Sequence, residues 1–115
     1  PELHKLTPTL GILQLRGYKV ALLTDGRMSG ASGKVPAAIH LTPEAKDGGM
    51  ISKIRTGDLI RLDANSGELS CLNFEIVKER EASIKDNTNT FGFGRELFSN
   101  LRNLVSSSED GASFL

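Results

Sequence analysis

The side chains best suited to chemistry lie in a glycine-rich polar segment, residues 25–33, with the sequence Asp-Gly-Arg-Met-Ser-Gly-Ala-Ser-Gly. Its glycines allow a ligand to approach the backbone, and successive exposed amides in such a loop can cradle an anion. Arg27 can bind a carboxylate or a phosphate through two parallel hydrogen bonds, and Asp25 can orient that ligand or hold a metal. The residues alone leave a structural alternative open, in which Asp25 pairs with Arg27 to stiffen a turn and the serines bond their own backbone.

The elements before and after this segment would place it at the end of a strand. Residues 18–24 form an apolar run of strand length that is hydrophobic on both faces at its centre, which predicts a buried strand. Apolar residues three or four apart predict a helix over residues 3–15, which Gly17 ends. A second short strand is expected at residues 37–41. Because open α/β sheets bind ligands at the carboxyl ends of their strands, this position favours a site.

A hairpin and two further helices are expected in the second half of the chain. Residues 59–63 and 68–72 flank Asn65-Ser66-Gly67, a pattern typical of an antiparallel hairpin with glycine in a left-handed position. Residues 74–82 and 94–105 have helical patterns. Helices at the two ends of a set of buried and half-buried strands indicate an α+β or β/β/α domain.

The remaining segments predict shorter features. Thr42-Pro43-Glu44-Ala45 suggests a short helix with threonine as N-cap and proline at its first position, and Gly48-Gly49 should end it. Residues 50–54 suit a brief strand or turn. Residues 83–90, rich in polar side chains, are typical of a linker or mobile loop. The small polar tail from Ser106 onward is expected to fray.

Composition bounds the class of protein. A chain of 115 residues fits one domain, and its 14 basic and 14 acidic residues balance, so no overall field would attract nucleic acid or an anionic membrane. The single cysteine, Cys71, excludes an internal disulfide, favours the cytoplasm and cannot hold an iron-sulfur cluster alone. No apolar stretch is long enough to span a membrane, and no signal peptide is apparent. Because the chain starts at Pro1 and enters a helical pattern without a cap, we expect a piece of a longer protein.

Four stretches resemble one enzyme family. Residues 21–32, from Ala21 through Thr24-Asp25-Gly26-Arg27 to Ser32, are similar to the second signature of the family that contains dihydroxy-acid, 6-phosphogluconate and sugar-acid dehydratases. Residues 33–40, 42–45 and 92–98 resemble the 6-phosphogluconate branch in particular. The resemblance implies the C-terminal domain of a hydro-lyase, a swivelling β/β/α domain with a mixed sheet or partly closed barrel flanked by helices.

The resemblance also implies a reaction and its cofactors. The reaction is dehydration of 6-phospho-D-gluconate to 2-dehydro-3-deoxy-6-phosphogluconate, a step of the Entner-Doudoroff pathway of gluconate metabolism. A 4Fe-4S cluster, bound by cysteines of a larger N-terminal domain, would act as Lewis acid on the departing hydroxyl. Mg²⁺ is a possible second cation, with Glu2 as a ligand, although a first-turn glutamate favoured by the helix dipole explains Glu2 equally well. Ser29 would take the C2 proton, its alternative role being that of a turn serine.

Substrate contacts and partners follow from the same resemblance. Asp25, Arg27, Ser32 and Lys34 are the expected substrate-binding residues, with Lys34 reaching the phosphate unless it is an ordinary surface lysine. His40 is either an acid-base group or a structural histidine. The expected partners are the N-terminal domain of the same chain, a phosphorylated sugar acid and, at full length, a second subunit of a homodimer. The alternatives are a sugar-acid or dihydroxy-acid dehydratase, or a non-catalytic module that binds phosphorylated sugars.

Overall fold

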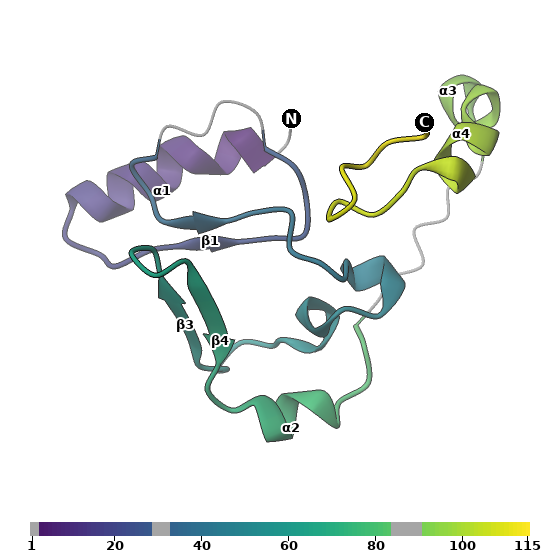
Figure 1. The fold of residues 1–115 in the computed structure, drawn as a ribbon. Helices are drawn as coiled ribbons and strands as arrows, with labels where there is room; N and C mark the ends of the chain where they lie inside the picture. The colour runs from purple at the N-terminus through teal and green to yellow at the C-terminus, as the bar shows by residue number, and fades with distance from the viewer. Residues whose placement is uncertain (1–2, 29–32, 84–90) are drawn as a thin grey trace.

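The structure of the chain is a computed structural model that describes residues 3–28, 33–83 and 91–115 (Figure 1). Helices and strands alternate irregularly along the chain, and several of the helices are single 3₁₀ turns, labelled η. In chain order they are η1 (Leu3–Lys5), α1 (Leu6–Leu15), β1 (Leu22–Leu23), β2 (Ala37–Ala38), η2 (Ala45–Asp47), η3 (Met50–Lys53), β3 (Ile60–Asp63), β4 (Glu68–Cys71), α2 (Phe74–Lys78), α3 (Phe93–Leu97) and α4 (Ser99–Leu104).

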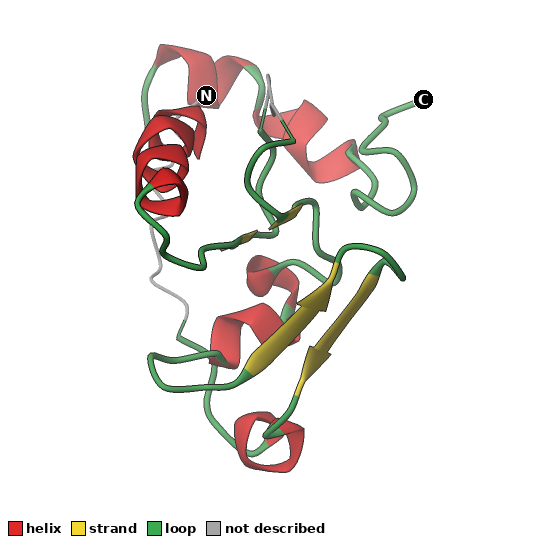
Figure 2. Cartoon of the chain, turned by 90° about the vertical axis from the view of Figure 1, so that its left-hand side faces the viewer, coloured by secondary structure: helices red, strands yellow, loops and turns green. Residues whose placement is uncertain are grey.

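The fold class is α+β, as predicted, but the described strands do not form a mixed sheet or a closed barrel. They form two separate pairs, β1 with β2 in parallel and β3 with β4 antiparallel (Figure 2). The pairs face each other across side chains and not through backbone hydrogen bonds, since Leu23 of one pair and Ile60 and Leu69 of the other line the same apolar hollow. Side-chain packing between the pairs takes the place of the pairing that a barrel would need.

The helix and hairpin predicted from local patterns are present. The predicted helix over residues 3–15 is formed by η1 and α1, and Gly17, with φ 90°, ends it as predicted. There the amide of Tyr18 donates to the carbonyl of Leu13 at 3.1 Å and the amide of Gly17 to that of Gln14 at 3.0 Å, which is the hydrogen-bond pattern of a Schellman motif.

The β3–β4 hairpin has the predicted position and direction. Its register pairs Ile60 with Cys71 and Asp63 with Glu68. Gly67 has φ 71°, the left-handed conformation expected of it. The carboxylate of Asp63 accepts hydrogen bonds from the amides of Asn65 at 3.0 Å and Ser66 at 3.3 Å. These bonds stabilise the turn.

The parallel pair is shorter and less buried than predicted. Of the predicted strand over residues 18–24 only Leu22–Leu23 pairs, and both residues are half-buried because β1 has a single neighbouring strand. The second strand, predicted over residues 37–41, stops at Ala38. The strand does not continue to residue 41 because His40 adopts the left-handed conformation, with φ 56°, which is incompatible with an extended backbone.

The segment after β2 also differs from its prediction. The short helix η2 begins at Ala45 with Glu44 as N-cap, so Thr42 is not the cap and Pro43 is not the first helical residue. Gly48, with φ 81°, ends η2 as predicted. Residues 50–53 form the 3₁₀ helix η3 where a brief strand or turn was predicted.

The C-terminal part forms helices where they were predicted, in shorter pieces. The helix predicted over residues 74–82 ends at Lys78, and the one predicted over residues 94–105 is divided into α3 and α4. Most of the predicted linker, residues 84–90, lies outside the described residues. The tail does not fray as predicted, because the amides of Ser106 and Ala112 donate to the carbonyls of Ser113 and Ser107, each at 2.8 Å, and close a turn.

A buried ion pair fastens α2 to the loop before β3. Arg80 donates from both of its terminal nitrogens to the carboxylate of Asp58, at 2.6 and 2.9 Å, and the Asp58 side chain is only 4% exposed. The amide of Arg55 and the side-chain amide of Asn73 each donate to the same carboxylate at 2.8 Å. These hydrogen bonds hold the pKa of Asp58 well below its usual value, and the bond from Arg80 contributes most. Asp58 in turn raises the pKa of Arg80.

The core is small. Val77 is fully buried and Val35 is 8% exposed, and they are the apolar side chains that the described part of the chain buries. Within residues 3–28, 33–83 and 91–115, no helix has the length and apolar character needed to cross a membrane.

Candidate functional site

The first half of the glycine-rich segment lies directly after β1, at the carboxyl end of the parallel pair. Backbone hydrogen bonds continue past the two strands: the amide of Thr24 donates to the carbonyl of Ala38 at 3.0 Å, and the amide of Leu41 donates back to the carbonyl of Thr24 at 3.2 Å. The amide of Gly26 donates to the hydroxyl of Thr24 at 2.9 Å and closes a local turn. The position predicted for the loop, at the end of a strand, is confirmed.

Asp25 is anchored to another element of the chain. Its carboxylate accepts a hydrogen bond of 2.7 Å from the amide of Ala45, the first residue of η2. The first amides of a helix have no partner inside it, and a carboxylate is a strong acceptor for them. Asp25 therefore caps η2 from 20 residues away, and among the described residues it forms no ion pair with Arg27. The alternative in which these two residues stiffen the turn together is not what the structure shows.

A side chain at Gly26 would fit tightly. A Cβ atom at this position would lie 3.0 Å from Cδ1 of Leu3 and 3.2 Å from Oγ1 of Thr24. The hydroxyl of Thr7 lies 3.4 Å from the sulfur of Met28. The start of the N-terminal helical segment thus packs against the loop, and Gly26 permits this close approach.

The two cationic candidates, Arg27 and Lys34, lie at the two ends of the loop. Arg27 and Lys34 are both exposed. The backbone carbonyl of Lys34 accepts a hydrogen bond of 2.6 Å from the side-chain amide of Gln14 in α1, which fixes the far end of the glycine-rich segment to that helix. Directly after Lys34, Val35 is buried and lines a hollow together with residues of α1. Within the described residues, no hydrogen bond or ion pair joins Asp25, Arg27 and Lys34 to one another.

His40 lies next to the loop through its backbone. Its amide donates to the carbonyl of Gly26 at 3.2 Å, while its side chain is exposed. The neighbouring residues on the two sides, Ile39 and Leu41, line two different apolar hollows. The left-handed conformation of His40, which the sequence did not indicate, is what directs the chain from one hollow to the other.

Three of the candidate residues lie outside the described part of the structure. These are Ser29, the candidate base, Ser32, a candidate substrate contact, and Glu2, the candidate metal ligand. Their roles stay predictions.

Glu44 connects the site to the C-terminal tail, a contact that sequence reasoning missed. Its carboxylate accepts a hydrogen bond from the hydroxyl of Ser108 at 3.1 Å and lies 3.5 Å from the ammonium of Lys46. A hydrogen bond to Asp47 and the charge of Glu44 raise the pKa of Lys46. No local sequence signal marks the pair of Glu44 and Ser108, because 64 residues separate them.

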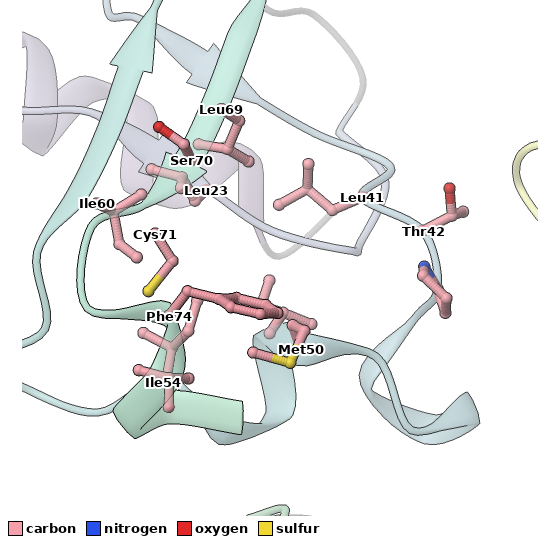
Figure 3. Close-up of a pocket in the computed structure, with 13 residues that line it drawn as sticks. Leu23, Leu41, Thr42, Met50, Ile54, Ile60, Leu69, Ser70, Cys71 and Phe74 are labelled. Atoms are coloured by element: carbon pink, nitrogen blue, oxygen red, sulfur yellow. The ribbon is translucent and has the colours of Figure 1, made fainter. Parts of the chain in front are cut away.

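An apolar hollow of about 300 Å³ lies between the hairpin, η3 and α2 (Figure 3). Figure 3 shows Ile60 and Cys71 from the hairpin, Met50 from η3 and Phe74 from α2 converging on it. None of its lining side chains is Asp, Glu, His, Lys or Arg, and most are apolar, so it is an extension of the core. The candidate site is the loop at the end of β1.

The residues of this chain do not fit an iron-sulfur cluster by themselves. A cluster needs several thiolates, and the chain has one cysteine, whose thiol lies 3.5 Å from the side-chain oxygen of Asn73. Nor do the described residues contain a group of three or more His, Cys, Asp or Glu side chains that could hold a metal ion. A cluster would need thiolates from outside this chain, and a metal ion would need ligands besides those that the described residues bring together.

Comparison with known proteins identifies the class of this chain. The family model for the dihydroxy-acid/6-phosphogluconate dehydratase C-terminal domain matches residues 1–112. The chain therefore belongs to this family, as its motifs predicted.

Individual relatives give a more specific likeness. The phosphogluconate dehydratase of Rhizobium meliloti is 56% identical over 117 residues, which cover 100% of this chain and 19% of that protein. The phosphogluconate dehydratase of Escherichia coli is 56% identical over 115 residues, covering 98% of this chain and 19% of that protein. A dihydroxy-acid dehydratase of Wolinella succinogenes is 45% identical over 87 residues, covering 74% of this chain and 15% of that protein. The chain spans about a fifth of the length of the phosphogluconate dehydratases it matches.

Proposed function

We propose that this chain is the C-terminal domain of a hydro-lyase that dehydrates 6-phospho-D-gluconate to 2-dehydro-3-deoxy-6-phosphogluconate. The observation that carries the proposal is the likeness to phosphogluconate dehydratases, 56% identical over the whole chain, which exceeds the 45% likeness over 74% of the chain to a dihydroxy-acid dehydratase. The glycine-rich loop would supply the chain's share of the active site.

In this proposal Ser29, as its alkoxide, takes the proton from C2 of the substrate and the C3–O bond breaks with its electron pair. The departing hydroxide takes up a proton, which restores the charge that Ser29 removed, and leaves as water. The enol that remains becomes the 2-keto product when C3 takes up a proton. A serine hydroxyl acts as a base only where positive charge stabilises its alkoxide, so this step needs a second domain. The 4Fe-4S cluster that the family resemblance implies would supply Lewis-acid chemistry there, with Mg²⁺ as a further cation and Glu2 among its ligands.

The described residues support a positioning role for the loop. Asp25, tied to η2, and Gly26, packed against Leu3, fix its first half. Gln14 fixes its second half through the carbonyl of Lys34. Arg27 and Lys34, both exposed, would receive the carboxylate and the phosphate of the substrate, because a guanidinium suits the first and a flexible ammonium the second. Ser32 is a further proposed substrate contact.

The proposal is tested by grafting. The matching C-terminal segment of the Escherichia coli phosphogluconate dehydratase is replaced by this chain, and the grafted enzyme is assayed with 6-phosphogluconate, a non-phosphorylated sugar acid and a dihydroxy acid. We expect turnover of 6-phosphogluconate above the other two. Preference for either of the others would overturn the substrate assignment, and a folded graft with no activity would favour the non-catalytic binding module.

Two further expectations depend on the whole enzyme. A homodimer at full length is a proposal that the mass of the grafted enzyme in solution would check. The cytoplasmic location favoured by the single cysteine stays a prediction.

A further inference from the structure

The helical pair α3–α4 carries an apolar surface with no cover from the described chain. Every residue from 91 to 105 is exposed, including Phe93 at 87% and Leu104 at 67%. The pair lies apart from both strand pairs (Figure 1). Arg102 donates to the carbonyl of Arg95, and the hydroxyl of Ser99 to that of Glu96, so the two helices are held together as one unit.

The pattern of this pair is amphipathic. Its apolar residues recur at the three- and four-residue spacing of an amphipathic helix, with polar residues between them. The apolar set is Leu97, Phe98, Leu101, Leu104 and Val105, and the polar set between them is Ser99, Asn100, Arg102 and Asn103. Helices of five and six residues are too short to be stable in water unless this face packs on something.

The solvent-accessible area of the chain is larger than that of a compact monomer of the same mass. The chain exposes 9000 Å², whereas a folded monomer of 12.4 kDa exposes about 6,100 Å². Its radius of gyration is 16.2 Å, against about 13 Å for a compact domain of this length. A standard protein interface takes about 800 Å² from each partner. The excess is several times that area and fits a permanent partner better than a transient one.

We infer that the apolar face of α3–α4 docks into a hydrophobic groove on the N-terminal part of the same dehydratase polypeptide. The inference rests on the proposed function, since it takes the partner from the four-fifths of the relatives that this chain does not match. A domain on the same polypeptide is present at a high effective concentration, which favours it over a second copy of the chain. Helix-in-groove packing is the usual mode for such a stripe.

The docking face is connected to the candidate site. Ser108, four residues after α4, donates a hydrogen bond to the carboxylate of Glu44. The next residue, Ala45, donates its amide to the carboxylate of Asp25 in the loop. Docking of α3–α4 would therefore also hold the glycine-rich loop after β1 close to the N-terminal domain. An active site that is divided between the two domains requires this position of the loop.

Hydrogen exchange tests the inference in the grafted enzyme and in the isolated chain. We expect the amides of residues 91–105 to exchange at least ~10-fold more slowly in the graft, while those of the hairpin turn, residues 65–67, keep the same rate in both. Equal rates for 91–105 in the two proteins would overturn the inference. Slow exchange in the isolated chain that depends on its concentration would assign the face to a second copy and also overturn it.

Substitutions give a second readout. The double variant Leu97→Ser with Leu101→Ser should lose the slow exchange in the graft, whereas Leu15→Ser, at a residue 90% exposed at the end of α1, should keep it. Slow exchange retained in the double variant would count against docking through this face. A graft with protected helices and no dehydratase activity would refute the proposed function alone, and an active graft with unprotected helices would refute this inference alone.

Discussion

Substitution of Gly49 by alanine tests the packing that supports the candidate loop. Gly49 is buried between η2 and η3, with φ −57°, so its conformation suits any residue. A Cβ atom there would lie 1.7 Å from the carbonyl oxygen of Pro43 and 2.6 Å from its carbon. Real Cβ atoms do not approach closer than 3.0 Å, so the backbone must move by more than an ångström. The clashing carbonyls belong to Pro43 and Glu44, which directly precede η2, the helix to which Asp25 is anchored.

The expected cost is ~3 kcal/mol, the upper part of the range for overpacking, because the clash involves backbone that cannot rotate away. The midpoint of thermal unfolding should fall by about 10 °C. Circular dichroism during heating and during urea titration of the 115-residue chain measures both quantities.

Two other glycines provide matched controls. Gly48→Ala meets no atom within 4 Å but has φ 81°, so it should cost only ~1 kcal/mol. Gly11→Ala, inside α1 and also with nothing within 4 Å, should stabilise the chain by about 0.5–1 kcal/mol. If Gly49→Ala unfolds at the same temperature as Gly48→Ala or higher, the close packing of η2 on η3 is refuted.

Three further changes have defined outcomes. Asp25→Ala removes the cap of η2 and should lower the free energy of unfolding by about 1 kcal/mol, as measured by urea titration; no loss would mean that the 2.7 Å contact is not stabilising. Val77→Ala, at a fully buried position, should cost ~2 kcal/mol by the same measurement, and a cost near zero would contradict its burial. Because the pKa of Asp58 is lowered, its contribution is present above about pH 4, the unfolded pKa, and is lost as the pH falls toward the folded pKa. The stability difference between the chain and Asp58→Asn should therefore shrink below pH 4, and a difference independent of pH would refute the pairing.

Features set by neighbouring residues could be predicted from the sequence. Gly17 ends α1 and Gly67 turns the hairpin because each position needs a left-handed residue, a requirement that operates within a few residues. The glycine-rich loop was located correctly at the end of β1 because the apolar run directly before it indicates a strand. Such features depend on a few neighbouring residues and not on contacts with distant parts of the chain.

Features set by distant contacts could not be predicted. Asp25 caps η2 across 20 residues, and Arg80 pairs with Asp58 across 22, without any periodic pattern that would indicate either contact. The apolar run over residues 18–24 predicted a buried strand in a larger sheet, yet only two residues pair, since apolar character alone does not specify which strands become neighbours. The mixed sheet or partly closed barrel was expected from the family resemblance, whereas the described strands form two separate small sheets and no closed barrel.

The same limit applies to the candidate site. The motif names Ser29, Ser32 and Glu2, but their arrangement depends on a second domain and on residues outside the described ranges. What the structure adds is the anchoring of the loop by Asp25, Gly26 and Gln14.

The most direct test of the central claim is the rate of 6-phosphogluconate dehydration by the grafted enzyme and its Ser29→Ala variant. We expect the substitution to lower kcat by at least about 100-fold, the usual contribution of a general base, while the unfolding temperature stays unchanged. Ser66→Ala, in the exposed hairpin turn, should keep full activity as the matched control. Retention of most activity by Ser29→Ala would contradict the claim that this loop supplies the base.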